Sequence, residues 1–204
     1  RIKPENKQLV LDTIRNTVYE MEKWSKMKLE IFRGDSFQIV IDNPYEAVRI
    51  AILIRAGLQK STPEGSEIKW DARLALGLGS VNFSQEESVT ESDGEAFRNS
   101  GWEFDELGKR KLAIRTPWQN MNDELKVSTA FADDIVSEWS VAQAQAIYAS
   151  LIHSKTQKEI AADLNTSPQN ISKRIIAGKE YLIRPYLDRC KQIITAKIQT
   201  DGIK

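Results

Sequence analysis

The sequence predicts an α+β protein with an all-helical C-terminal part, and three observations indicate this. Residues 28–32 and 37–41 are rich in β-forming residues and flank a Gly-Asp turn, a pattern typical of a β-hairpin. Apolar residues recur at helical spacings on both sides of this hairpin. From residue 141 onward the apolar spacing is helical throughout. The chain therefore combines a mixed N-terminal part with a helical C-terminal part.

The N-terminal part contains a helix, the hairpin, a second helix and a strand, in that order. The helices span residues 4–24 and 45–59, because apolar residues repeat along one side of each. Residues 70–83 are predicted to form one long strand. Within it, Gly77 and Gly79 mark positions where a ligand or another backbone comes close.

Further elements complete the prediction and divide the chain into regions. The sequence favours a helix at residues 97–107, a strand at 111–115, and helices at 123–139, 141–152 and 181–199. The regions are an α+β domain of residues 1–120, a helical connector of residues 121–140 and a helical domain of residues 141–204.

One stretch of the helical domain predicts two short helices joined by a tight turn. Thr156 and Glu159 match a T-x-x-E capping box, in which hydroxyl and carboxylate accept hydrogen bonds from the free backbone amides of a helix start. Asn165 suits a left-handed residue that ends the first helix. Ser167 and Pro168 are an N-cap and a first-turn proline, so a second helix begins close behind.

The outer side of this stretch carries chemistry suited to DNA. Ile171 and Ile175 face inward, while the outer side holds amides that pair with adenine edges and cations that reach guanine or phosphate. The stretch resembles the helix-turn-helix segments of bacterial regulators, especially the sigma-factor and LuxR-like kind. It departs from them at Asn165 and at Arg174, where several such motifs carry an aliphatic residue. A plain helical hairpin with solvated polar residues is the alternative.

If the stretch binds DNA, its second helix is expected to enter the major groove. Gln169, Asn170 and Lys173 are assigned to base edges, and residues 156–158 and Arg174 to phosphates. The full predicted DNA-binding set is Thr156, Gln157, Lys158, Ser167, Gln169, Asn170, Ser172, Lys173 and Arg174.

The charge of the chain is unevenly distributed. Overall, 29 Lys and Arg balance 29 Asp and Glu. From residue 153 onward there are 10 Lys and Arg against 5 Asp and Glu, so the rest of the chain is acidic. A basic end on an acidic body suits a DNA-binding appendage, because the phosphate backbone attracts cations.

Three short motifs of the N-terminal part resemble those of known families. They are the turn Arg33-Gly34-Asp35-Ser36, the glycine-bearing strand of residues 73–79, and the segment Ser-Asp-Gly-Glu-Ala-Phe at residues 92–97. With the order of elements, they resemble the ferredoxin-like palm domain of class III nucleotidyl cyclases and GGDEF-type enzymes. With the helix-turn-helix stretch added, the chain resembles the SatD family, small bacterial proteins with a cyclase-like N-terminal part. This implies a palm domain without its N-terminal strand, since the chain begins at the first helix.

The cyclase resemblance implies a site at the Gly-Asp turn. Asp35 would bind Mg²⁺, a hard cation that takes oxygen ligands. A nucleotide would contact Gly34, Asp35, Ser36, Gly94 and Arg98. Cyclases stabilise the transferring phosphates with an asparagine and an arginine, but the aligned positions here hold Arg98 and Trp102, so the usual transition-state groups are absent. A Gly-Asp turn of purely conformational origin is the alternative.

The sequence thus predicts a DNA-binding regulatory protein rather than an enzyme, with a cyclase-like domain that senses a nucleotide-type ligand or mediates assembly. A homodimer is expected, through residues 181–199 or the cyclase-like domain, because a single helix-turn-helix rarely binds tightly enough alone. The alternatives are a Mg²⁺-dependent nucleotidyl-transfer enzyme centred on Asp35, and a partner-binding scaffold. DNA reading itself requires no cofactor.

The cytoplasm is the expected location, and no membrane contact is expected. The single cysteine, Cys190, cannot form an internal disulfide, and with the single histidine, His153, it matches no familiar metal-site spacing. No stretch approaches the twenty apolar residues that a membrane-spanning helix requires.

Overall fold

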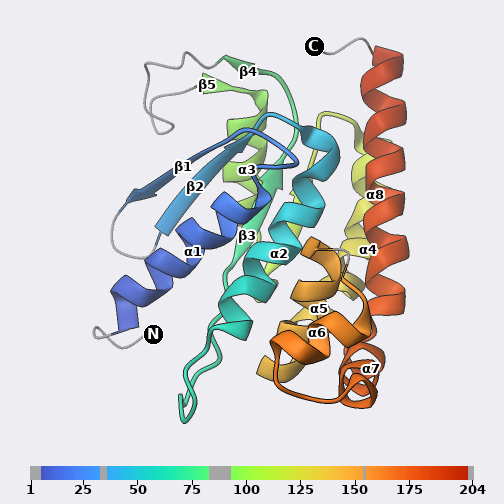
Figure 1. Ribbon diagram of the computed structural model, residues 1–204. Helices are drawn as coiled ribbons and strands as arrows, with labels where there is room; N and C mark the ends of the chain where they lie inside the picture. The colour runs from blue at the N-terminus through green and yellow to red at the C-terminus, as the bar shows by residue number, and fades with distance from the viewer. Residues whose placement is uncertain (1–5, 33–35, 83–92, 154, 202–204) are drawn as a thin grey trace.

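The computed structural model describes residues 6–32, 36–82, 93–153 and 155–201. It is an α+β structure in which helices predominate (Figure 1). The strands described form three separate two-stranded sheets. The mixed fold class predicted from the sequence is therefore confirmed.

The chain begins with a helix, a hairpin and a second helix. These are α1 (Lys7–Met21), β1 (Met27–Phe32), β2 (Ser36–Ile41), the short 3-10 helix η2 (Pro44–Glu46) and α2 (Ala47–Lys60). β1 and β2 pair antiparallel along their whole length. The predicted hairpin and the helices on either side of it are confirmed.

The middle of the chain contains short strands around one helix. They are β3 (Leu74–Gly77), β4 (Val81–Asn82), β5 (Asp93–Gly94), α3 (Glu95–Asp105) and β6 (Leu112–Arg115). β3 pairs with β6 in parallel, and β4 pairs with β5 antiparallel. The strand predicted at residues 111–115 is confirmed.

The prediction of one long strand at residues 70–83 is wrong, because β3 and β4 belong to different sheets. Gly79 between them has a φ of 149°, which side-chain-bearing residues rarely adopt, so the chain changes direction there. A Cβ atom on Gly77 would lie 2.0 Å from the carbonyl oxygen of Ala96, so α3 packs directly on the strand backbone. The expectation that another backbone comes close to these glycines is confirmed.

The C-terminal part is helical, as predicted. Its elements are α4 (Gln119–Ser137), α5 (Val141–His153), α6 (Gln157–Asp163), α7 (Pro168–Ala177) and α8 (Glu180–Asp201). The long helix α8 runs along one side of the molecule and contacts α4 and η2 (Figure 1). The hydroxyls of Thr129 on α4 and Tyr186 on α8 lie 2.9 Å apart and join the two helices.

One hydrophobic core joins elements from both ends of the chain. α2 lies at its centre, buried along nearly its whole length and packed against α1 and α5 (Figure 1). The core contains Ile14 of α1, Leu53 of α2, Ile147 of α5 and Ile183 of α8. Helices α5 and α8 therefore rest on the same apolar interior as the hairpin and α1.

A buried ion-pair cluster around Arg55 ties α2 to α4 and to the segment before β3. The Arg55 side chain is 0 % exposed. Its guanidinium donates to both carboxylate oxygens of Asp71, each at 2.9 Å, and to Asp133 Oδ1 at 2.6 Å. It also donates to Ser137 Oγ at 2.8 Å. The backbone N–H of Lys111 donates to the second oxygen of Asp133 at 2.8 Å, so β6 joins the same cluster.

The pKa of Asp71 reflects two opposing effects. Burial by itself raises it, but the hydrogen bonds and positive charges of Arg55 and Lys111 outweigh burial and hold the pKa below the usual range. Asp71 is therefore ionised when folded and stabilises the fold above its unfolded pKa. This contribution is lost as pH falls from the unfolded pKa through the folded one.

Replacing Arg55 by methionine tests this cluster. Arg55→Met leaves Asp133 buried without its cation and Asp71 with Lys111 as its one cation among the described residues, and we expect a loss of about 3–5 kcal/mol in the free energy of unfolding at neutral pH. Without the guanidinium the pKa of Asp71 rises, so the difference in stability between the variant and the wild type shrinks as the solution is acidified to about pH 5. Urea unfolding at both pH values measures this.

Arg15→Met on the exposed side of α1 is the matched control, since among the described residues Arg15 pairs only with Asp12, at the surface, and should contribute little. An Arg55→Met loss as small as that of the control, or one independent of pH, contradicts the proposed role of the cluster.

Candidate nucleic-acid interface

Helix α6 begins with the predicted capping box. Thr156 Oγ1 accepts the backbone N–H of Glu159 at 3.3 Å, and Glu159 Oε2 accepts the backbone N–H of Thr156 at 2.7 Å. The pKa of Glu159 lies below its usual value, first because of this backbone hydrogen bond and then because of the Thr156 hydroxyl. Two backbone amides at the helix start are thus satisfied within the first turn.

The turn after α6 has the hydrogen bonds of a Schellman motif. The backbone N–H of Thr166 donates to Ala161 O at 2.9 Å, and that of Asn165 donates to Ala162 O at 3.3 Å. Asn165 has a φ of 47°, which confirms the predicted left-handed residue. The end of α6 is therefore fixed by hydrogen bonds between backbone atoms.

Helix α7 begins as predicted. Ser167 is its N-cap, with Oγ accepting the backbone N–H of Asn170 at 3.2 Å, and Pro168 occupies the first turn. The side-chain amide of Asn170 also donates to Thr166 Oγ1 at 3.2 Å. The turn and the first turn of α7 therefore share one set of hydrogen bonds.

The inner sides of α6 and α7 enclose a small hydrophobic cluster. Its buried members are Ile160 and Ala161 of α6, Ile171 of α7 and Ala146 of α5. Ile175 is partly buried against it. The predicted inward direction of Ile171 and Ile175 is confirmed, and α5 supplies the surface on which both short helices pack.

The predicted DNA-binding residues lie on the outside of this unit. Gln169, Asn170 and Lys173 on α7 are exposed. Residues 156–158 at the start of α6 are exposed as well, whereas Ser167, Ser172 and Arg174 are half-buried. The predicted inner side of this unit is therefore buried, and most of the predicted outer side is exposed.

Contacts between distant parts of the sequence hold α7 and α8 to the rest of the molecule. The buried indole N–H of Trp139 donates to Gly178 O at 2.7 Å. A Cβ atom on Gly178 would lie 2.4 Å from Ile147 Cδ1, so the junction of α7 and α8 packs closely on α5. Ser150 on α5 donates to Glu180 at the start of α8, at 2.8 Å. Our sequence predictions did not identify these positioning residues.

Sequence signals for two of these residues exist. Gly178 follows an apolar helical run, where a helix is expected to end. Trp139 carries an N–H that needs a partner when buried. Neither signal shows that Trp139 and Gly178 contact each other, because the two residues are 39 positions apart in the sequence.

The predicted nucleotide and metal site is only partly described. Gly34 and Asp35 lie outside the described residues, while Ser36 begins β2 and is exposed. Gly94 ends β5 and is buried, and Arg98 is an exposed residue of α3. Within the described ranges, no group of three His, Cys, Asp or Glu side chains is placed to hold a metal ion. Asp35 as a Mg²⁺ ligand stays a prediction.

Substitutions at Asn165 test the left-handed turn. Asn165→Ala should lower the free energy of unfolding by about 1 kcal/mol, because a Cβ-bearing residue without a polar side chain is strained at positive φ. Asn165→Gly should preserve or raise it. Ala162→Gly on the exposed side of α6 is the control. It should lower the free energy of unfolding by about 1 kcal/mol, whereas Asn165→Gly should not lower it. Equal urea midpoints for the two Asn165 variants contradict the assigned turn.

Comparison with known proteins assigns no family to the chain. No family model matches it, and no curated protein or solved structure matches it. In the part of the chain that the structure describes, no helix has the length and apolar character needed to cross a membrane. The function therefore has to follow from the geometry and chemistry of the residues themselves.

Proposed function

We propose that this protein is a DNA-binding regulator that reads the major groove with α7. One observation carries the proposal: α6 and α7 form a compact pair, capped at both helix starts and joined by a fixed turn, with apolar residues inside and amides and cations outside. In a helix-turn-helix protein, the second helix enters the major groove and its first residues contact base edges. α7 has the arrangement that this role requires.

The exposed side chains divide into base-contacting and phosphate-contacting candidates. Asn170 and Gln169, exposed on the first turn of α7, carry the donor and acceptor pair that recognises adenine. Lys173 follows along α7 as an exposed cation. Lys158 and Gln157 at the start of α6 would contact phosphates, which position the protein without reading sequence. The excess of cations from residue 153 onward supports this assignment.

The remainder of the chain would sense a ligand or mediate assembly. The β1–β2 hairpin and β3 pack on the same core as α1 and α2, although they belong to separate two-stranded sheets. A cyclase-like body followed by a helix-turn-helix, as in the SatD family, is therefore proposed on the sequence resemblance. Asn99, a buried side chain of α3, donates to Leu78 O at 2.7 Å and so helps to fix α3 against the end of β3. A nucleotide-type ligand of this body is part of the proposal.

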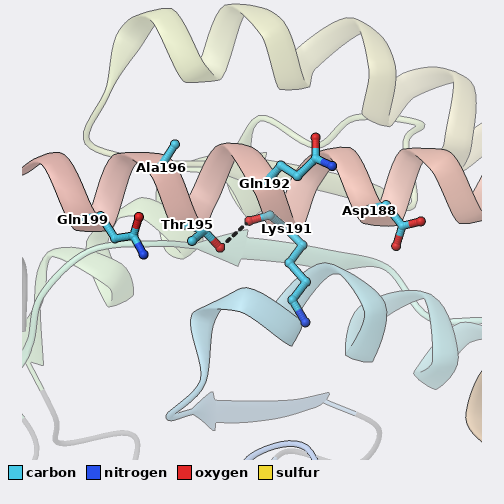
Figure 2. A pocket seen from close by; sticks show the side chains of 6 residues that line it. All are labelled: Asp188, Lys191, Gln192, Thr195, Ala196 and Gln199. Carbon is cyan, nitrogen blue, oxygen red and sulfur yellow. Dashed lines mark hydrogen bonds between the residues drawn. The ribbon is translucent and has the colours of Figure 1, made fainter.

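A homodimer, through residues 181–199 or the cyclase-like domain, is also part of the proposal, and within residues 181–199 the start of α8 is the more apolar part. Tyr181 and Leu182 are 61 % and 46 % exposed there, beside Ile176 at the end of α7. Further along α8, mostly polar side chains line a pocket (Figure 2). They are Asp188, Lys191, Gln192, Thr195, Ala196 and Gln199. Lys191 is already paired with Glu46 of η2.

Substitutions on the two classes of DNA contact test the reading role. On duplex DNA enriched from a random pool by the wild-type chain, Asn170→Ala should cost about 1–3 kcal/mol for the enriched sequence and little for random DNA. Lys158→Ala should weaken binding to the enriched and the random DNA alike. The slope of log affinity against log salt concentration should also fall by about 1, the effect of losing one phosphate contact. Electrophoretic shifts at several salt concentrations measure both effects.

Lys126→Ala on the exposed side of α4 is the matched control for loss of a positive charge, since α4 lies outside the proposed interface. Two results would contradict the role assignment: an Asn170→Ala loss of equal size on enriched and random DNA, or a Lys126→Ala effect as large as that of Lys158→Ala.

Sedimentation tests the dimer. The wild type should sediment as a dimer, and the double variant Tyr181→Ser, Leu182→Ser as a monomer that binds one half-site, because the apolar contact is removed. Gln192→Ser on the polar stretch of α8 is the control and should remain dimeric. A monomeric wild type at tens of micromolar, with and without DNA, excludes the dimer and with it half-sites about 34 Å apart.

A further inference from the structure

Asn170 is held at two points before any DNA is bound. Its backbone N–H donates to Ser167 Oγ at 3.2 Å, and its side-chain Nδ2 donates to Thr166 Oγ1, also at 3.2 Å. Its neighbour Gln169 is equally exposed, but its side chain has no hydrogen-bond partner among the described residues. Of the two amides on the first turn of α7, only that of Asn170 is fixed.

The position of Thr166 is set by α6 and the turn rather than by α7. Its backbone N–H donates to Ala161 O at 2.9 Å, and it directly follows Asn165, whose φ of 47° fixes the direction of the chain. Thr166 is half-buried between the two helices. The backbone that carries the Thr166 hydroxyl is therefore fixed, and the hydroxyl lies within hydrogen-bond distance of the Asn170 side chain on α7.

The hydrogen bond to Thr166 determines what Asn170 can still offer. An asparagine side chain has one carbonyl oxygen and two N–H groups. One N–H is used by Thr166, which leaves one acceptor and one donor. Adenine presents the complement in the major groove, an N6 amino donor beside the N7 acceptor, whereas guanine presents two acceptors and cannot satisfy the Asn170 oxygen.

We propose that Thr166 is a positioning residue that orients the Asn170 amide for a bidentate contact with adenine and so determines specificity at one base pair. This inference rests on the proposed function. Ordering the side chain before binding removes part of the entropy cost of the contact, which strengthens the matched complex. Thr166 itself touches no base in this arrangement.

The test uses the full chain and the DNA that it enriches from a random pool. The base pair read by Asn170 is the one at which Asn170→Ala loses discrimination. Thr166→Val keeps the shape of the side chain but removes the hydroxyl. We expect it to lower the preference for adenine at that base pair by about three- to tenfold, the effect of one hydrogen bond. Thr166→Ser keeps the hydroxyl and should keep the preference.

A double-variant cycle separates positioning from a general structural effect. In an Asn170→Ala background, Thr166→Val should cause no further loss of discrimination, because the residue that Thr166 orients is gone. Gln169→Ala should lower the discrimination between base pairs by the same amount whether residue 166 is threonine or valine. An unchanged adenine preference in Thr166→Val, or an equal loss in both backgrounds, overturns the inference.

A measurement without DNA keeps the inference testable even if valine disturbs the turn. The Asn170 Nδ2 proton that faces Thr166, observed by NMR in the free protein, should be shifted and protected from exchange in the wild type and in Thr166→Ser, and should exchange like a free side-chain amide in Thr166→Ala. Identical Asn170 amide signals in all three overturn the inference. A wild-type chain that enriches no DNA sequence, while these signals behave as expected, contradicts the proposed function and not the hydrogen bond.

Discussion

The buried guanidinium of Arg55 is the constraint on which the arrangement of this molecule depends. A charge with 0 % exposure is very costly unless it is paired and hydrogen-bonded, and each guanidinium nitrogen of Arg55 donates to a carboxylate, with one bond more to a hydroxyl. Asp71 lies before β3, whereas Asp133 and Ser137 lie on α4, so the partners of Arg55 come from two segments far apart in the sequence. Because the pairing is satisfied only when α2, α4 and the segment before β3 lie together, it selects one packing of these elements.

A continuous set of hydrogen bonds extends from this cluster to the proposed reading unit. Ser137, which accepts from Arg55, lies at the end of α4, where the Lys69 ammonium donates to the carbonyl oxygens of Ser137 and Trp139. The Trp139 indole in turn donates to Gly178 at the end of α7. The N-terminal part of the molecule and α7 are therefore connected through the end of α4.

Local features of this structure were predictable from the sequence, and features that join distant segments were not. The capping box of Thr156 and the left-handed Asn165 depend on neighbouring residues, so their patterns identify them. The role of Arg55 was not predicted, because its partner Asp133 is 78 residues away in the sequence. The long strand predicted around Gly79 was wrong because its backbone conformation depends on packing with α3.

Mapping of backbone amide shifts by NMR, on addition of duplex DNA enriched by the full chain, tests the central claim most directly. The account predicts the largest shifts at residues 156–158 and 167–174, weaker shifts near Gly178 and Trp139, and progressive loss as salt is raised. The largest shifts on the β1–β2 hairpin or on α4, with α7 unchanged, would contradict DNA reading by α7.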